Sequence, residues 1–491
     1  MTAGESTLSV AAAREREALA WLFSFSDWER GVGWSRDAAP EEVWKLGRTR
    51  ALLDLAGAPD RNLRIVHVAG TKGKGSTVAY LEAIGRAAGW HTGTYTQPHL
   101  HHYRERIRLD GEPVDAETFA DGVDRLRSLV DQLTALHPEA GAPTTFELTT
   151  VLAVLLSARV GVDVLIAEVG LGGRLDATNA LSTDLAVLAR IGLDHRQILG
   201  RTLAEIAAEK VAIVRPGQTV LTVRQRPAAR RVVEAYCAGV AANLRTVSPL
   251  RMRGGPGGRS QVTGQLASGE RYQATLGLSQ LLEGVGEHQR QNAALAVAAA
   301  EALTGLGLSL SIEAAQSGLE GAWLPARLEM VRVRPRVMID AAHNADSARA
   351  LAEELRQWSC RPLWLVLGIL RDKDAAAILR ELLPLASGVI AVTPTSPRAL
   401  PADHLAVACH QIGGVVVERA SSVGAGLTLA QRRSGRDGAV VVAGSFATAS
   451  EAREALGLSE VVTPAARRRW LRAGGLEGGT SSDSEGRPGS W

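Results

Sequence analysis

Short runs of apolar residues alternate with amphipathic stretches along most of the chain. Each run ends in a polar turn, and most turns lead into a segment whose apolar residues recur with helical spacing. Strands that are apolar without alternation are typical of parallel sheets with helices on both faces. The pattern therefore predicts an α/β fold. The runs occupy residues 65–69, 162–170, 184–192, 336–344, 363–370 and 439–444.

The six runs fall into two groups, separated by the segment GLEGAWLPARLEM at residues 318–330. A chain of 491 residues is long enough for two or three domains at about 100 to 200 residues each. We expect a first domain over residues 1–320, which includes N-terminal helices, and a second α/β domain over 321–463. Residues 464–491 lack periodic apolar positions, so we expect a disordered tail there.

Composition excludes several classes of protein. The chain is 46% hydrophobic and 22% charged with a net charge of +3, which is ordinary for a soluble enzyme and does not indicate a nucleic-acid partner. Three widely spaced cysteines predict neither a disulfide framework nor a CxxC metal site. We find no signal peptide and no apolar stretch of about 18 residues. We therefore expect a cytoplasmic protein that does not bind membranes, and take a monomer as the default.

The first apolar run leads directly into a glycine-rich turn with the sequence GTKGKGST. Glycines let successive backbone N–H groups point at one anion, a lysine adds positive charge, and the following helix directs its positive end to the same place. The turn predicts a site for a nucleoside triphosphate. Its residues are Gly70, Thr71, Lys72, Gly73, Lys74, Gly75, Ser76 and Thr77.

This turn is a variant of the standard P-loop. The pattern GxxxxGK[ST] requires glycine where Val68 stands and a hydroxyl residue where Gly75 stands. A glycine-rich hairpin or surface turn is the alternative. The apolar strand before the turn and the helical pattern after it favour phosphate binding.

Polar residues that end apolar runs are further candidates, because ligands of doubly wound sheets bind beyond the carboxyl ends of the strands. Glu168 ends one run and is followed by a turn that contains Asp176, while Asp194 and His195 follow another run. Glu168 has the position of a carboxylate that holds Mg²⁺ directly or through water. His195 is a further possible metal ligand. The alternatives are that the acidic residues at the strand ends cap helices and that the histidine is structural.

The order and spacing of many segments resemble the folylpolyglutamate synthase and dihydrofolate synthase branch of the Mur ligase superfamily. The resemblance covers most of the chain. It implies a two-domain Mur-ligase-like architecture, in which a P-loop NTPase domain precedes a smaller Rossmann-like α/β domain. The segments include residues 47–77, TYTQPHLHHYRERIRLDGEPV, TTFELTT, VDVLIAEVGLGGRLDATNAL, IGLDHRQILG, AEKVAIVRPG, GEHQRQNAALA, PARLEMV, MIDAAHN and VLGILRDKD.

The resemblance implies an ATP-dependent amide ligase that uses Mg²⁺ and adds L-glutamate to a folate-type carboxylate. The acceptor is dihydropteroate, a reduced folate such as tetrahydrofolate, or both, and the reaction passes through an acyl phosphate. Lys74 would neutralise the β- and γ-phosphates, while Glu168 and His195 would hold magnesium. Both chemical steps spread negative charge over oxygens, so positioned cations matter more than a protein nucleophile.

The resemblance also assigns a modified lysine and a second group of nucleotide contacts. Lys210 would be carbamylated by CO₂, although a lysine late in an amphipathic helix is usually solvated. Arg327, Asp340 and His343 would contact the nucleotide from the second domain, and Asn292 would lie near the adenine or ribose. A salt bridge that links the domains is the alternative for Arg327.

For the pterin, the resemblance points to Asp176, Ala177 and Phe146, whose aromatic face can stack on a flat ring. Phe146 is as well explained as a core residue. The chain departs from the family at Gln97, where the usual residue is a serine that helps to bind magnesium. Gln97 offers only a neutral carbonyl oxygen, so we expect more water around the ion.

Three other functions remain open. A P-loop switch or motor ATPase would hydrolyse nucleotide without glutamate or folate. A cell-wall ligase of the same superfamily would need a further domain before the P-loop, and only 69 residues precede Gly70. A nucleotide-binding structural protein is disfavoured because Lys74, Glu168 and His195 are all present.

Overall fold

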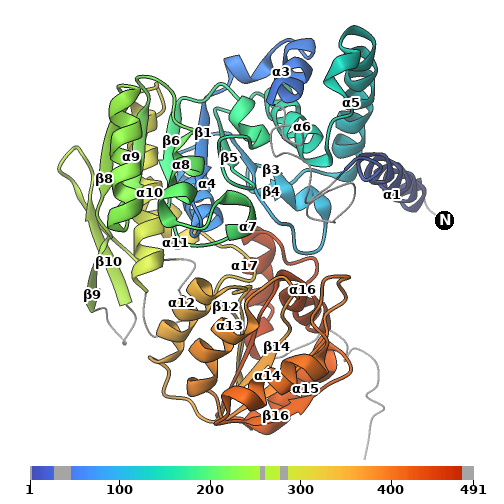
Figure 1. The fold of residues 1–491 in the computed structure, drawn as a ribbon, viewed down its shortest axis with the longest axis vertical. Coiled ribbons are helices and arrows are strands. Elements are labelled where there is room, and N and C mark those ends of the chain that lie inside the picture. The colour runs from blue at the N-terminus through green and yellow to red at the C-terminus, as the bar shows by residue number, and fades with distance from the viewer. Residues whose placement is uncertain (1–2, 27–45, 255–259, 277–285, 478–491) are drawn as a thin grey trace, which may run out of the picture. The chain divides into compact units, whose positions relative to one another are not determined.

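The computed structural model describes residues 3–26, 46–254, 260–276 and 286–477 (Figure 1). The chain divides into two compact units. The first comprises Met1–Arg253, Gln261–Leu276 and Glu287–Ala322, and the second consists mainly of Trp323–Trp491. Both units combine helices with largely parallel sheets, so the predicted α/β class is confirmed.

The first unit is built on an eight-stranded sheet. Six neighbouring strands of this sheet are parallel. The other two, β3 and β4, extend it as an antiparallel edge. In sheet order the strands are β4 (Glu112–Pro113), β3 (Ile107–Leu109), β2 (Thr92–Tyr95), β5 (Val164–Glu168), β1 (Ile65–Ala69), β6 (Leu185–Leu188), β7 (Thr219–Val223) and β8 (Asn243–Val247).

Helices bury both faces of this sheet. Ile65 of β1 belongs to one apolar cluster with residues of α5 (Ala116–Leu136) and α6 (Thr145–Val160), and Ala69 belongs to another with residues of α8 (Leu203–Val211) and α9 (Pro227–Gly239). Val66 and Val68 alternate with these positions and are also fully buried. Helices α4 (Lys74–Ala87) and α10 (Glu287–Thr304) pack against each other and against the strands. Burial on both faces explains why these strands are apolar without alternation.

The helices of the first unit begin at conventional caps in several cases. Thr144 and Glu147 form a capping box at α6, and Thr202 and Glu205 form one at α8. The helices are α1 (Ala3–Leu22), α3 (Leu46–Leu55), α4 (Lys74–Ala87), α5 (Ala116–Leu136), α6 (Thr145–Val160), α7 (Arg196–Leu199), α8 (Leu203–Val211), α9 (Pro227–Gly239), α10 (Glu287–Thr304) and α11 (Ile312–Gly321). A separate three-stranded sheet contains β9 (Arg251–Gly254), β10 (Ser260–Gln265) and β11 (Arg271–Ala274).

The second unit has a six-stranded sheet that is parallel except for the edge strand β12. Its strands, in sheet order, are β12 (Glu329–Val333), β13 (Arg336–Ile339), β17 (Ala439–Ala443), β14 (Leu363–Leu367), β15 (Gly388–Ala391) and β16 (Val416–Arg419). Its helices are α12 (Ala345–Leu355), α13 (Ala375–Leu382), α14 (Ala402–Ile412), α15 (Val423–Ser434), α16 (Phe446–Ala455) and α17 (Pro464–Arg472).

Helix α17 corrects the prediction of disorder from residue 464 onward. Thr463 caps this helix by accepting a hydrogen bond from the N–H of Ala466, and Pro464 occupies its first turn. The guanidinium of Arg467 lies 5.5 Å from the ring centroid of Trp323. The prediction is therefore wrong for residues 464–477. Helix α17 lacks an apolar periodicity, and its N-terminal cap and a cation–π contact stabilise it instead. Residues 478–491 lie outside the described residues.

Among the helices that the structure describes, none combines the length and the apolar character needed to cross a membrane.

Candidate active site

The predicted phosphate-binding turn lies where β1 ends and α4 begins. Gly70 and Gly73 have φ angles of +151° and +87°, which residues with a Cβ rarely adopt. Gly73 is the N-cap of α4, so the N–H groups of the turn that begins at Lys74 lack intrahelical acceptors. The loop thus presents backbone donors and the positive end of a helix at the carboxyl edge of the sheet.

The loop is anchored to the segment that leaves β6. The backbone N–H groups of Thr71 and Lys72 donate to the carbonyl oxygen of Arg190 at 2.9 and 3.1 Å. The Thr71 hydroxyl accepts from the N–H of Gly192 at 3.0 Å and donates to its carbonyl oxygen at 3.1 Å. Lys72 Nζ lies 3.0 Å from Oδ2 of Asp194. Backbone and side-chain bonds therefore join two turns that are far apart in sequence.

Asn292 of α10 lies against the same loop. A Cβ at Gly73 would collide with its side-chain amide, which also donates to Gln289 Oε1 at 3.4 Å. The contact places Asn292 beside the phosphate-binding backbone. It also explains why glycine is required at position 73.

Lys74, Glu168 and Gln97 come together at the carboxyl ends of adjacent strands. Val68 of β1 pairs with Glu168 of β5, so Glu168 lies next to the loop that follows β1. Lys74 Nζ lies 3.7 Å from Glu168 Oε1, and the N–H of Gln97 donates to Oε2 at 3.4 Å. The buried Glu168 carboxylate is thus held between a lysine and a backbone donor.

His195 immediately precedes α7, in the turn that follows β6. It has a left-handed backbone with a φ of +49°, and its Nε2 lies 3.9 Å from Asp194 Oδ1. Its side chain is 30% exposed. The structure therefore places His195 beside the Lys72–Asp194 ion pair.

The residues around Glu168 fit a magnesium ion that keeps most of its water. In the described ranges, no three His, Cys, Asp or Glu side chains form a metal-binding group, and Mg²⁺ usually takes only one or two carboxylates from a protein. Thr77 Oγ1 and Gln97 Nε2 are buried without a hydrogen-bond partner among the described residues. Both atoms can donate a hydrogen bond, so they fit an anionic ligand beside the turn, whereas a magnesium ion would be met by the Glu168 carboxylate and by Gln97 Oε1.

Lys210 of α8 is buried rather than solvated. Only 5% of its surface is exposed, and its Nζ donates to the carbonyl oxygen of Gly172 at 3.5 Å. Burial, together with the positive charges of Lys74 and Lys72, lowers the pKa of Lys210 to about 7. A substantial fraction of this amine is therefore neutral, and nucleophilic, near neutral pH.

Asp176 and Ala177 stabilise the turn that follows β5. The Asp176 carboxylate accepts hydrogen bonds from the N–H groups of Leu171 and Thr178 at 2.9 and 3.0 Å. Burial raises the pKa of Asp176 above its ordinary value. Ala177 is also buried. The bonds of Asp176 thus lie within its own turn, where they shape the backbone.

Phe146 of α6 lies beside the turn that follows β5. It is partly buried, and its ring centroid lies 6.1 Å from that of Tyr95. A Cβ at Gly170 would contact both the Phe146 ring and Gln97 Oε1 at 2.8 to 2.9 Å. Phe146 therefore packs against the core and also borders the turn near Glu168.

The predicted residues of the second unit form a cluster of their own at the end of β13. The guanidinium of Arg327 lies 4.7 Å from the ring centroid of Phe446, and the His343 ring lies 5.7 Å from it. Asp340 accepts two backbone hydrogen bonds at 2.8 Å. Burial raises the pKa of Asp340, while the charge of Arg327 opposes this shift.

Phe446 is the residue of this cluster that the sequence analysis misses. It begins α16, shortly after the apolar run at 439–444 that the sequence predicts to be a strand. Its position beyond a strand end was the available signal. Phe446 is missed because the search for ligand-binding residues at strand ends considers polar side chains, whereas Phe446 is an aromatic residue that packs against an arginine.

Comparisons with known proteins give a consistent result. A family model described as Mur ligase, glutamate ligase domain, matches residues 326–446. Dihydrofolate synthase/folylpolyglutamate synthase of Bacillus subtilis is 35% identical over 367 residues, which cover 73% of this chain and 83% of the relative. The protein of the same name from Mycobacterium tuberculosis is 35% identical over 389 residues, which cover 74% and 77%.

The fold agrees with a solved structure as well. The crystal structure of Mycobacterium tuberculosis folylpolyglutamate synthase complexed with ADP and AMPPCP matches with a TM-score of 0.79 and 30% identity. The match covers 90% of this chain and 98% of that one.

Proposed function

The chain belongs to the folylpolyglutamate synthase and dihydrofolate synthase family of ATP-dependent glutamate ligases, and on this basis we propose roles for its own residues. The resemblance seen in the sequence and the two-domain Mur-ligase-like architecture are thereby confirmed. The enzyme joins L-glutamate to a folate-type carboxylate with consumption of ATP. The main support for these roles is the contact between Lys74 and Glu168 at the start of α4, where Lys74 Nζ lies 3.7 Å from Glu168 Oε1.

The reaction has two steps. An oxygen of the acceptor carboxylate attacks the γ-phosphorus of ATP, which forms an acyl phosphate and releases ADP. The amino group of glutamate then attacks the acyl carbon, and phosphate leaves as the amide forms. Lys74 and the N–H groups of the P-loop would bind the β- and γ-phosphates and stabilise the charge that develops on their oxygens.

Glu168 would hold magnesium, with His195 and Gln97 as its further candidate ligands. When bound, the ion would neutralise phosphate charge in the transition state. Lys72 contributes to the same region through Asp194, whose 3.0 Å ion pair fixes the turn before His195. This arrangement supports one functional unit made of the P-loop and the two turns after β5 and β6.

Lys210 is proposed to be carbamylated. Its neutral amine would attack the carbon of CO₂ and lose a proton to water, so that a cation becomes a carbamate anion. The lowered pKa supplies the neutral amine, and the neighbouring charges of Lys74 and Lys72 favour an anion at this position. Such an anion would help to position the metal and the phosphates.

Arg327, Asp340, His343 and Asn292 are proposed nucleotide contacts. The stacking of Arg327 on Phe446 supports a guanidinium that is oriented before it meets an anion. The position of Asn292 against Gly73 supports a role close to the phosphate-binding loop.

We propose that both dihydropteroate and reduced folates serve as acceptors, since the relatives from Bacillus subtilis and Mycobacterium tuberculosis carry both activities in their names. Phe146 and the turn with Asp176 and Ala177 would border the pterin. We also propose a monomer that acts in the cytoplasm; its three free cysteines fit a reducing compartment.

The test is ADP release with Mg²⁺ and L-glutamate in the presence of dihydropteroate, of tetrahydrofolate, or of neither. The expected result is release that depends on acceptor and glutamate, with a product heavier by one glutamyl unit in both acceptor reactions. Product from one acceptor alone would refute dual use. Release that ignores both substrates would instead support a P-loop switch or motor ATPase.

A further inference from the structure

His67 is a buried imidazole in the middle of the strand that leads to the P-loop. Strand β1 (Ile65–Ala69) reads IVHVA, and its histidine is completely shielded from solvent. Alternate residues of a strand share a face, so His67 lies on the same face as Ile65 and Ala69, each of which belongs to an apolar cluster. A polar group in such surroundings costs free energy unless it is hydrogen-bonded. The proposed reaction assigns no role to His67, and its hydrogen bond indicates one.

This hydrogen bond joins His67 to the turn that follows β5 (Val164–Glu168). His67 Nε2 lies 2.8 Å from the hydroxyl oxygen of Thr178, which is also fully buried. The same hydroxyl donates its proton to Oδ1 of Asp176. Because a hydroxyl has one proton, the Thr178 oxygen must accept the bond from His67, whose Nε2 therefore carries the hydrogen. The three side chains form a directed chain of hydrogen bonds from β1 to the Asp176 carboxylate.

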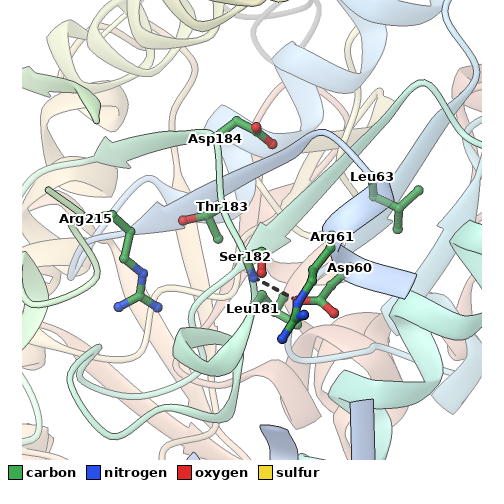
Figure 2. Close-up of a pocket in the computed structure, with 8 residues that line it drawn as sticks. All are labelled: Asp60, Arg61, Leu63, Leu181, Ser182, Thr183, Asp184 and Arg215. Carbon is green, nitrogen blue, oxygen red and sulfur yellow. Dashed lines mark hydrogen bonds between the residues drawn. The ribbon is translucent and has the colours of Figure 1, made fainter. Parts of the chain in front are cut away.

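The surroundings of His67 keep its ring neutral. Burial lowers the pKa of His67 to about 3, and the positive charge of Arg215 adds to this shift. Arg215 is itself held by donating to the carbonyl oxygen of Asn179, and it lines a cavity of about 360 Å³ together with the segment 181–184 (Figure 2). A neutral imidazole has one N–H group, and among the described residues Nδ1 of the ring has no hydrogen-bond partner. The bond to Thr178 therefore fixes the orientation of the ring.

The chain of hydrogen bonds ends at the backbone beside the proposed acceptor site. While one oxygen of Asp176 takes the bond from the hydroxyl, the other accepts from the N–H of Leu171 at 2.9 Å. Gly170, which precedes Leu171, lies so close to Phe146 that an added Cβ would sit 2.8 Å from its ring. A carboxylate that is engaged on both oxygens holds this stretch of backbone in place. His67 is thus connected, through two side chains, to the turn that would border the pterin.

We propose that His67 is a positioning residue for the folate-type acceptor, because its bond to Thr178 holds the turn that would border the pterin. This role rests on the proposed function, and His67 itself touches neither substrate. The P-loop is held separately, through bonds of Thr71 to Arg190 and Gly192. Loss of the bond from His67 should therefore weaken binding of the acceptor and leave binding of ATP in place.

The test is steady-state kinetics of full-length variants with each acceptor that the wild-type enzyme uses. His67→Leu and Thr178→Val each remove the hydrogen bond, while an apolar side chain fills the space. Each should raise the KM for the acceptor about tenfold, as expected for one buried hydrogen bond, and change the KM for ATP less than about twofold. His67→Gln keeps an N–H group and Thr178→Ser keeps the hydroxyl, so both should stay within about threefold of the wild-type KM.

Two further variants separate the chain of hydrogen bonds from general effects on the sheet. The double variant of His67→Leu and Thr178→Val should have about the same acceptor KM as Thr178→Val alone, because both changes break the same chain. Thr92→Val is the matched control, since Thr92 of β2 is fully buried and its hydroxyl has no hydrogen-bond partner among the described residues. Both KM values should be unchanged in this control.

A second measurement does not depend on ligase activity. Hydrogen exchange of the full chain without ligands, followed by mass spectrometry, should be faster over residues 170–179 in His67→Leu and Thr178→Val than in the wild type. Exchange over the P-loop, residues 70–77, should be unchanged. Because valine has nearly the same shape as threonine, Thr178→Val should fold even if the replacement of His67 does not.

Several results would overturn the proposal. An unchanged acceptor KM in both single variants, additive losses in the double variant, or equal rises in the KM for acceptor and for ATP would each show that His67 does not position the acceptor. Unchanged exchange over residues 170–179 would show the same. Failure of the proposed function looks different, because the wild-type enzyme itself would then release ADP regardless of acceptor and glutamate.

Discussion

Lys72 Nζ lies 3.0 Å from Oδ2 of Asp194, and this ion pair joins the P-loop to the turn that carries His195. Both side chains are mostly buried, with exposures of 23% and 13%. The neighbouring hydrogen bonds between Thr71 and Gly192 hold the two backbones together. We infer that the pair fixes the spacing between the proposed phosphate-binding and metal-binding groups.

Breaking this pair should weaken nucleotide binding. Lys72→Met and Asp194→Asn should each raise the KM for ATP about tenfold, because the loop loses an attachment worth about 1–3 kcal/mol. Since Lys72 is also a proposed ATP contact, the informative measurement is a double-mutant cycle by steady-state kinetics. The double variant should lose less than the sum of the single losses. Additive effects would show that the pair does not act as a unit.

Lys74 should be needed for chemistry and not for folding. We expect Lys74→Ala to lower kcat/KM at least about 100-fold, because a preorganised cation is lost where negative charge develops on phosphate oxygens. Loss of the 3.7 Å ion pair with Glu168 is offset by relief of the repulsion between Lys74 and Lys210, so the variant should remain folded, which its thermal unfolding curve checks. A folded variant with full activity would contradict the phosphate-binding assignment.

The sequence predicts the parts of the site that depend on local pattern and strand order. An apolar strand followed by a glycine-rich turn and a helix fixes the position of Lys74 at the start of α4. Glu168 ends the neighbouring strand β5, so the parallel pairing of β1 with β5 brings the two side chains together. These relationships follow from rules that hold for doubly wound sheets in general.

The remaining features depend on tertiary contacts that carry no local pattern. The Lys72–Asp194 pair forms only when the P-loop packs against the segment after β6. For Lys210, the helical spacing of the apolar residues around it predicts a solvated side chain. Burial of Lys210 follows from packing around α8 that the spacing of its apolar residues does not reveal. Helix α17 is missed because its arginines contact Trp323 in place of an apolar face.

Gly73 should not tolerate a side chain. Gly73→Ala adds a Cβ at a φ of +87° and drives it into the amide of Asn292, so ATP binding and stability should both fall. Gly89→Ala is a matched control, since Gly89 has a φ of +83° but no atom within 4 Å of the added Cβ. It should show only backbone strain, about 1–2 kcal/mol in urea unfolding.

The collision itself is tested by relieving it. Adding Asn292→Ala to Gly73→Ala should recover part of the lost stability, because the obstructing amide is removed. Equal losses in Gly73→Ala and Gly89→Ala would show that the contact with Asn292 has no energetic consequence.

The second unit should depend on a buried ion pair. Arg453 is fully buried, pairs with Glu329 and donates to the carbonyl oxygen of Leu458 at 2.8 Å. Arg453→Met should lower the free energy of unfolding by about 3–5 kcal/mol, because the buried Glu329 carboxylate keeps its hydrogen bond from the N–H of Ala326 but loses its paired cation. Adding Glu329→Gln should restore part of that loss in urea unfolding. A loss below about 1 kcal/mol in Arg453→Met would contradict the importance of the pair.

Lys210 should give stability a distinctive pH dependence in CO₂-free buffer. Its folded pKa of about 7 lies below the ordinary value of 10.5, so between these pH values the unfolded chain holds a proton that the folded chain lacks. Unfolding free energy should therefore rise with pH in this window, by at most about 1.4 kcal/mol per pH unit from this group, and the contribution is lost as pH falls through 7. Lys210→Met should flatten the profile by that slope.

Activity should depend on CO₂ through the same amine. Exhaustive removal of CO₂ and bicarbonate should lower kcat, and adding bicarbonate should restore it, because the carbamate forms reversibly from the neutral amine. Lys210→Ala should be inactive in both conditions and should regain some activity with added formate, a small carboxylate that can occupy the place of the carbamate. Full activity of the wild-type enzyme without CO₂, at a pH near 8, would show that an unmodified amine is sufficient for catalysis.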